Sequence, residues 1–531
     1  MKQKNYIGRS LLLVLLVVAG VVGLGFVPVF EVFGFETEHV DIFSSLRAEP
    51  SEEAAFEYVA DMSRLEEELS QMSAPQDTLP EMPPVSYHLI DEAVAEVLRP
   101  ALRSEDIRPD TTRRVIPIEV FDTSAYTRVD RFIDKLISGE AVRIAFMGDS
   151  FVEGDIITVD MRDELQRLFG GRGVGFVPCD IPYATARKSV KRTSRGWTSY
   201  SIMKPKAAPE ALRDLFCVSG YISKGGVGAS TRWQSLDIYP TLDSCERGRG
   251  FLLSRDSSRV ELIVNDTLRC EVDVAADTRL RELRVDMPVR SLALKILDGS
   301  VVCYGASLEG RGGVTLDNFS VRSNNGHAIF GTSASINRQV DDILGYDLVV
   351  LQYGLNIMLP NQRNFSKYRD QLCDMIAYAE RSFPNAAILV LGVSDRWIKS
   401  EDTGNYQPIG SVDALTSYQR AAADSTHVAF WNTSEAMAEY GGIRGFVSKG
   451  WAAGDYTHIN YAGGKRIAQS LVAAIRDRAY RALAEREREA CEHHDERRRV
   501  VEEYHRRADE RAAKVRNIIS TEVLREGSVA Q

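Results

Sequence analysis

Residues 141–170 read AVRIAFMGDSFVEGDIITVDMRDELQRLFG, and this stretch decides the fold. Its first part, AVRIAFM, is a short and almost wholly apolar run, which indicates a buried strand. Gly148, Asp149 and Ser150 follow this strand directly, and the helical pattern DMRDELQRLF comes after them. A strand, a tight turn and a helix in this order are typical of one α/β unit.

Further units of the same kind follow later in the chain. DLVVLQYGLN, from Asp347, reads as a buried strand, and the helical pattern FSKYRDQLCDMIAYAERSF comes next. AAILVLGVSD reads as another strand, and YAGGKRIAQSLVAAIRDRAYRAL, from Tyr461, reads as a closing helix. We therefore predict an α/β protein with a three-layer αβα fold and a mostly parallel sheet. Its site should lie at the carboxyl ends of the strands.

Between these units, residues 181–316 have a different pattern. SRVELIVNDTLRCEVDV and the segments around it alternate apolar and polar residues, and Asn-Asp, Met-Pro and Asp-Gly turns interrupt them. Short alternating strands at this spacing predict an antiparallel β-sandwich. We expect this sandwich to be inserted into a discontinuous α/β domain made of residues 116–180 and 317–475.

The N-terminus carries an uncharged apolar span, LLLVLLVVAGVVGLGFVPVF, at residues 11–30. About 20 apolar residues match the hydrocarbon core of a bilayer. Basic residues precede the span and acidic residues follow it, which predicts that the body of the protein lies on the extracytoplasmic, periplasmic side. We expect residues 1–30 to form a cytoplasmic tip and a single transmembrane anchor. A cleaved export signal is the alternative, and it gives the same location.

Two further segments flank the predicted body. Residues 31–115 are acidic and contain the turn-rich patch SAPQDTLPEMPPVS. We interpret them as a stalk or, alternatively, as an irregular extension of the body. Residues 476–531 are rich in charge with helical repetition, which predicts a solvated helix or a short coiled coil through which the chain could self-associate.

Composition narrows the classes of function. The net charge of −10 argues against nucleic-acid binding, because binding to phosphate backbones needs a basic surface. The seven cysteines include no C-x-x-C pair, and the adjacent His493 and His494 do not share a helix face, so we expect no metal site. No cofactor motif is evident. The odd number of cysteines leaves at least one thiol without a partner in the chain.

A second motif lies far along the chain from Ser150. Gly454-Asp455-Tyr456-Thr457-His458 comes just before the closing helix. A serine hydroxyl needs a base such as His458 to become a nucleophile, and Asp455 could hold the imidazole from the same loop. The alternative is that Asp149 and Ser150 only cap a helix, and that Asp455 is a loop residue and His458 caps the closing helix.

A third motif, Gly354-Leu355-Asn356, ends the strand VVLQY. An asparagine amide at the end of a strand can donate a hydrogen bond to the oxyanion of an acyl-transfer intermediate. Asn356 could instead be a turn residue, because asparagine tolerates left-handed conformations. Asp155 lies near the start of the helix after Ser150. It could support the catalytic residues from behind, but we favour its interpretation as a favourable charge at a helix N-terminus.

The order of these motifs resembles that of the SGNH/GDSL hydrolase family. The resemblance covers about residues 142–188 and 313–471, and it is most similar to the subgroup of peptidoglycan O-acetylesterases, which carry an inserted carbohydrate-binding-like β-sandwich. It implies that Ser150 is the nucleophile, His458 the general base and Asp455 the residue that orients the base. Asn356 would donate to the oxyanion, together with the backbone N–H of Ser150.

The chain departs from the family in its second block. LDNFSVRSNNGHA places Ser323 where the family has an oxyanion-hole glycine. Serine can replace glycine as a backbone donor where φ is negative, but not comfortably where φ is positive. Gly326 is a possible substitute. We predict an oxyanion hole that draws on Asn356, Ser323 and Gly354.

The resemblance implies an exported serine esterase that removes acyl groups, most simply O-acetyl groups, from a cell-envelope polysaccharide such as peptidoglycan. Hydrolysis of an acyl ester follows from the motifs themselves, whereas the acetyl group and the glycan follow from the resemblance. A lipase or thioesterase of the same superfamily is one alternative. A catalytically silent glycan-binding protein of the envelope is another.

Overall fold

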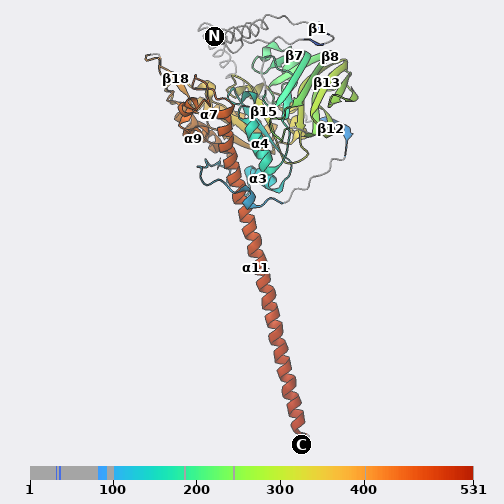
Figure 1. Cartoon of the computed structure of the whole chain (residues 1–531), viewed down its shortest axis with the longest axis vertical. Helices are drawn as coiled ribbons and strands as arrows, with labels where there is room; N and C mark the ends of the chain where they lie inside the picture. The colour runs from blue at the N-terminus through green and yellow to red at the C-terminus, as the bar shows by residue number, and fades with distance from the viewer. Residues whose placement is uncertain are drawn as a thin grey trace, which may run out of the picture. The chain divides into compact units, whose positions relative to one another are not determined.

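The structure is a computed structural model, shown in Figure 1, and it describes residues 31–32, 35–36, 82–92, 101–183, 187–242, 245–400 and 402–529. The chain divides into two compact units, Met1–Glu68 and Leu69–Gln531. In the first unit, β1 (Glu31–Val32) and β2 (Phe35–Glu36) form an antiparallel pair. The predicted anchor, residues 1–30, lies outside the described residues. Within the described ranges, no helix is both long and apolar enough to cross a membrane.

The second unit contains a six-stranded sheet in the order β15-β5-β16-β17-β20-β4. All neighbouring strands are parallel except β4, which runs antiparallel to β20. Every residue of β5, β16 and β17 is buried, as expected for parallel strands covered on both faces. The strands are β4 (Glu119–Val120), β5 (Val142–Gly148), β15 (Val314–Ser320), β16 (Leu348–Gln352), β17 (Ala387–Leu391) and β20 (Ala429–Trp431).

The helices associated with this sheet form two packed groups. One group is α3 (Arg128–Ser138), α4 (Thr158–Phe169) and the first part of α11 (Tyr461–Val529), and Figure 1 shows these helices side by side. The other group is α6 (Ala334–Leu344), α7 (Ser366–Ser382) and α8 (Val412–Ser425). Two short helices, α9 (Thr433–Ala438) and α10 (Gly442–Ser448), follow β20. The predicted mixed α/β fold is confirmed.

Ten strands of the second unit form a separate sheet in the order β11-β10-β13-β8-β14-β9-β12-β3, with β6 paired to β14 and β7 paired to β8. All pairs are antiparallel except β12 with β3. The strand pairing joins them into one connected sheet, so the two stacked layers of a sandwich stay a prediction. The strands are β3 (Val85–Asp91), β6 (Gly175–Pro178), β7 (Val190–Ser201), β8 (Tyr221–Ser235), β9 (Cys245–Leu253), β10 (Ser258–Val264), β11 (Leu268–Val274), β12 (Arg281–Val289), β13 (Ser291–Asp298) and β14 (Ser300–Glu309).

Strand β3 lies within the range that we interpreted as a stalk. It pairs in parallel with β12, and the Ser86 hydroxyl donates to Glu282 at 2.5 Å. Its alternating pattern of half-buried and exposed residues is that of a strand at the edge of a sheet. Farther along the same range, Ile107 is buried and its carbonyl accepts a hydrogen bond from Arg476 of α11 at 3.0 Å. Both stretches thus pack against the body of the protein. This agrees with the alternative interpretation, an extension of the body, and not with a stalk.

The C-terminal region differs from the predicted division at residue 476. The closing helix and the charged helix are one continuous helix, α11, from Tyr461 to Val529. Its first turns carry buried residues such as Leu471 and Ile475, whereas Val500 and Tyr504 are exposed. Helical propensity and i,i+4 ion pairs such as Arg506–Glu510 continue the helix beyond its buried part. Self-association through this segment stays a prediction.

A buried ion network joins the two sheets. Arg143 of β5 bonds to Asp317 of β15 at 2.7 Å and to Glu309 of β14 at 2.5 Å. Arg249 of β9 adds a second contact to Glu309 at 2.8 Å. Burial by itself would raise the pKa of Glu309, but the two guanidinium groups lower it to about 2. The network therefore stays charged at neutral pH and fixes the ten-stranded sheet beside β5, the strand that leads to Ser150.

Candidate active site

Ser150 lies in the tight turn that follows β5, at the carboxyl end of a central strand of the six-stranded sheet. Gly148 makes this turn possible. A Cβ atom at this position would lie 2.7 Å from a methyl carbon of Val152 and 3.1 Å from the side-chain oxygen of Gln352, so a larger residue would force these side chains to move. The turn thus exposes the Ser150 hydroxyl at the edge of the sheet where ligands of α/β folds bind.

Three predicted residues, Ser150, His458 and Asp455, are joined by hydrogen bonds. The Oγ atom of Ser150 lies 3.2 Å from Nε2 of His458. On the other side of the imidazole, Nδ1 lies 2.7 Å from Oδ2 of Asp455. A carboxylate on Nδ1 favours the tautomer whose Nε2 accepts a proton, which is the arrangement that a serine nucleophile needs.

The loop before α11 holds this acid–imidazole pair through its own backbone. The other carboxylate oxygen of Asp455 accepts hydrogen bonds from the N–H groups of Thr457, at 2.9 Å, and His458, at 3.0 Å. Burial would raise the pKa of Asp455, but the hydrogen bonds from the His458 ring and from these two backbone groups lower it to about 2. Asp455 is therefore an anion throughout the neutral range.

Aromatic side chains that we did not single out from the sequence pack against the same loop. The ring of Tyr456, whose φ is +55°, is stacked with Trp397 at 5.9 Å and with Tyr406 at 4.4 Å between ring centres. Trp397 and Tyr406 come from the hairpin of β18 (Trp397–Lys399) and β19 (Tyr406–Pro408). The backbone N–H of Trp397 also donates to the backbone carbonyl of Tyr456 at 3.1 Å. The hairpin thus supports the strained loop. Because hairpin and loop are far apart in the sequence, their contact could not be predicted from spacing.

Asn356 lies in a short 3-10 helix, η5 (Leu355–Ile357), after β16, and its amide nitrogen has two acceptors within the protein. Its Nδ2 donates to the carbonyl of Asn324 at 3.1 Å and to a carboxylate oxygen of Asp149 at 3.2 Å. Because an amide nitrogen carries two hydrogens, a donation to an oxyanion would have to replace one of these bonds. Gly354, at φ +124°, packs against Gln419 and Leu415 of α8.

In the second block, LDNFSVRSNNGHA, the backbone at Ser323 does not have the negative φ at which serine can easily replace glycine. Ser323 has φ +63°, in the left-handed region where a side chain is unfavourable. Gly326 has φ +104°, and its N–H donates to the side-chain oxygen of Asn324 at 2.8 Å. This block contributes the Asn324 carbonyl to the site, where it accepts a hydrogen bond from Asn356.

Asp149 connects the nucleophile turn to Asn356. It is completely buried, and one of its oxygens accepts from the Phe151 N–H at 2.8 Å. Burial raises its pKa to about 7, against the opposing effects of the Phe151 N–H and of His458. Sequence reasoning considered Asp149 only as a helix cap. The sequence signal for a role of Asp149 is its position next to Ser150, because carboxyl groups beside a nucleophile in a buried turn often have shifted pKa values.

Asp155 lies just before the N-terminus of α4, where the sequence places it, but its side chain is not at the surface. It is completely buried and accepts hydrogen bonds from Thr158 at 2.9 Å and from the Asn318 amide at 3.2 Å. Arg162 pairs with it at 3.4 Å. Burial would raise the pKa of Asp155, but Arg162 and Arg187 lower it well below its usual range. Asp155 therefore anchors α4 to β15 as a buried anion.

Across the described part of the chain, no group of three or more His, Cys, Asp or Glu side chains could hold a metal ion. The seven cysteines are free thiols, and Cys179, Cys217, Cys245 and Cys303 are buried.

Comparison with known proteins gives a match in structure but not in sequence. No family model matches the chain, and no curated protein sequence does. The fold matches a solved peptidoglycan O-acetylesterase with a TM-score of 0.55 and 21% identity, over 69% of this chain and 99% of the other. At this level of identity the likeness establishes the fold, so the predicted resemblance to SGNH/GDSL hydrolases is confirmed for the fold.

Two other solved structures have low TM-scores and support no argument. A family two carbohydrate esterase from Cellvibrio japonicus has a TM-score of 0.22 and 11% identity, over 54% of this chain and 98% of the other. A lipase/acylhydrolase from Enterococcus faecalis has a TM-score of 0.23 and 14% identity, over 31% of this chain and 77% of the other.

Proposed function

We propose that this chain is a serine esterase that removes O-acetyl groups from a cell-envelope polysaccharide such as peptidoglycan. The observation that carries the proposal is the hydrogen-bonded series from Ser150 through His458 to Asp455, with distances of 3.2 and 2.7 Å. The fold shared with a peptidoglycan O-acetylesterase supports the choice of substrate.

In the proposed reaction, the Ser150 oxygen attacks the carbonyl carbon of the acetyl ester while its proton passes to Nε2 of His458. The ionised Asp455 stabilises the imidazolium that forms. The tetrahedral intermediate then expels the sugar oxygen, which takes the proton from His458. Water, deprotonated by His458, attacks the acetyl-serine in the same way and releases acetate and the free hydroxyl of Ser150.

The oxyanion of the intermediate needs donors at the edge of the sheet. We propose the backbone N–H of Ser150 and the Asn356 amide, with Asn356 exchanging its bond to Asn324 or to Asp149 for the oxyanion. Catalytic hydrogen bonds in free enzymes are often poorly aligned and tighten only when the substrate is bound. In this proposal, Ser323 and Gly354 contribute through the shape that their backbone gives to the loops beside the oxyanion.

We also propose that residues 11–30 anchor the protein in the membrane with its body on the periplasmic side. The support is the uncharged span with basic residues before it and acidic residues after it. Cys491, which is exposed on α11, offers a natural label. A membrane-impermeant maleimide should label wild-type cells once the outer envelope is opened, and labelling should fall in Cys491→Ser. Labelling only after lysis of the inner membrane would contradict this location.

The function is tested by the hydrolysis of p-nitrophenyl acetate and by acetate release from O-acetylated peptidoglycan. A fluorophosphonate should modify Ser150 and abolish both activities, and chelators should leave them unchanged. A preference for long acyl chains would contradict an acetylesterase and favour a lipase or thioesterase.

Two observations favour a second candidate, a catalytically silent protein that binds glycan. Both hydrogens of the Asn356 amide have partners inside the protein, and Ser323 stands at positive φ where the family has glycine. In that case the purified protein binds envelope glycan but neither hydrolyses p-nitrophenyl acetate nor reacts with the fluorophosphonate.

A further inference from the structure

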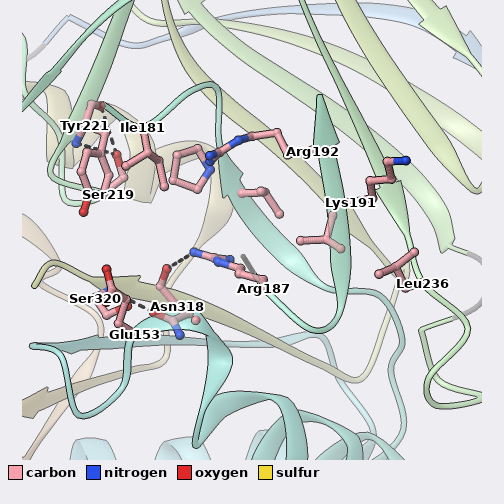
Figure 2. Close-up of a pocket in the computed structure, with 14 residues that line it drawn as sticks. Glu153, Ile181, Arg187, Lys191, Arg192, Ser219, Tyr221, Leu236, Asn318 and Ser320 are labelled. Carbon is pink, nitrogen blue, oxygen red and sulfur yellow. Dashed lines mark hydrogen bonds between the residues drawn. The ribbon is translucent and has the colours of Figure 1, made fainter. Parts of the chain in front are cut away.

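A cavity of about 310 Å³ opens between the turn after Ser150 and the first strands of the ten-stranded sheet. Figure 2 shows Glu153, Asn318 and Ser320 on one side of it, and Arg192, Ser219 and Tyr221 on the other. This volume is within the range of cavities that hold small ligands. No step of the proposed reaction uses this cavity.

The cavity is close to the nucleophile along the chain. Glu153 is three residues after Ser150, which limits the distance between their Cα atoms to about 11 Å. Ser320, on the same wall, is the partner of Gly148 in the pairing of β15 with β5. A glycan chain held in the cavity therefore lies within reach of Ser150.

Arg187 belongs to the wall of the cavity and is already satisfied by the protein. Its guanidinium donates to the carbonyl of Phe176 at 2.9 Å and to that of Asn318 at 2.6 Å, a contact that Figure 2 also shows. The buried anion Asp155 attracts it. This arginine needs no ligand.

Arg192 of β7 is in a different situation. Among the described residues, its guanidinium has no hydrogen bond or ion pair, although burial lowers the pKa of the group. Asp180 attracts it, but the two oxygens of Asp180 accept from Ser194 at 2.6 Å and Ser199 at 2.7 Å. Arg187 and Arg192 also repel each other, since each charge disfavours the other. Figure 2 shows the Arg192 side chain extending above Arg187 at this cavity.

Acceptor groups complete the lining. Glu153 is 8% exposed; its Oε2 accepts from Arg322 at 2.8 Å, whereas its buried Oε1 has no partner in the described part of the chain. Oε1 has almost no accessible surface, so Glu153 shapes this wall of the cavity and offers no contact to a ligand through that oxygen.

We propose that this cavity is a subsite for a carboxylate-bearing sugar unit of the substrate, with Arg192 binding the carboxylate. A planar guanidinium without a partner matches a carboxylate in a bidentate geometry. The carboxylate can belong to a uronic acid or to the lactyl group of a muramoyl unit. The inference rests on the proposed function, since it assumes that the glycan held here is the ester substrate.

The first test measures binding, so it does not depend on turnover. Purified full-length Ser150→Ala protein is titrated with a short oligogalacturonate, and then with the same oligomer after its carboxyl groups are reduced to alcohols. A peptide-free muramoyl glycan and its reduced form make the second arm. The charged form of at least one glycan should bind about tenfold or more tightly, about 1.4 kcal/mol. The preference should weaken as salt is added, and the tighter arm identifies the source of the carboxylate. Equal affinity for charged and reduced forms in both arms overturns the proposal.

The second test assigns the preference to a residue. Arg192→Gln should bind charged and reduced oligomers equally, and Arg192→Lys should keep part of the preference. The matched control is Arg195→Gln, on the same strand, where the side chain bonds to Ser230 and does not line the cavity. This control should keep the full preference. A folded Arg192→Gln protein that keeps it overturns the proposal, whereas absence of p-nitrophenyl acetate hydrolysis by wild type refutes only the esterase assignment.

Discussion

The two halves of the candidate site are built in different ways. On the base side, Asp455 and His458 are three residues apart, and one loop supplies the carboxylate, the imidazole and the backbone donors that hold them. On the oxyanion side, Asn356 is held by Asp149 and Asn324, which come from two other loops. On the base side, the hydrogen bonds already have the arrangement that the proposed reaction needs. On the oxyanion side, the hydrogens of the Asn356 amide are bonded to other groups of the protein. In the proposed reaction, substrate binding therefore has to rearrange the second half but not the first.

The largest effect should follow removal of the base. His458→Ala should lower kcat by about 10⁴–10⁶, and the double variant with Ser150→Ala should be no slower, because the two residues act as a unit. Steady-state hydrolysis of p-nitrophenyl acetate measures both. The control is His427→Ala, an exposed histidine just after α8, which should keep the wild-type rate. Losses that multiply in the double variant would show that the two residues act independently.

Asp455→Asn should lower kcat by about 10²–10⁴, less than loss of the imidazole. The reason is that an amide at this position no longer fixes the tautomer of His458. Since the pKa of Asp455 is about 2, its ionisation cannot produce a change of rate between pH 5 and 9. A variant with wild-type turnover across this range would separate Asp455 from the mechanism.

Asn356→Ala should lower kcat by about 10²–10³ if the amide turns to the oxyanion. If Asn356 only links its two partner loops, the change should instead be mainly a lower melting temperature with nearly normal kcat. Calorimetry and kinetics on the same preparation distinguish these outcomes, and the second would remove Asn356 from the oxyanion hole.

Asp149 should make stability depend on pH. Its pKa of about 7 in the folded protein lies above the ordinary 3.8, so folding favours the protonated form. That contribution is fully present below pH 4 and is lost as pH rises towards 7. Asp149→Asn cannot ionise, so its free energy of unfolding should rise relative to wild type between pH 4 and 7. Parallel urea curves for the two proteins would contradict this burial effect.

The smallest effect should come from Ser323→Gly. Relief of a side chain at φ +63° should raise the free energy of unfolding by about 1 kcal/mol, and kcat should stay within a few-fold. Ser323→Ala keeps the Cβ atom and serves as the control. A gain of tenfold or more in kcat would mean that strain in this loop limits the oxyanion hole.

The contrast also explains what could be predicted from the sequence. Buried strands such as β5 and β16 were predictable because their apolar runs are continuous, and the Asp455–His458 pair was predictable because its geometry is local. Strand β3 was missed because it lies beside a proline-rich patch and pairs with residues almost 200 positions away. The partners of Asn356 and the cavity at Arg192 depend on loops that meet only in the folded chain.

The most direct test of the central claim is acetate release from O-acetylated peptidoglycan by wild type and by Ser150→Ala, both shown to be folded. Wild type should release acetate steadily, and release by the variant should be slower by at least about 10⁴-fold. Equal release by the two proteins would contradict a nucleophilic role for Ser150, whatever the other variants do.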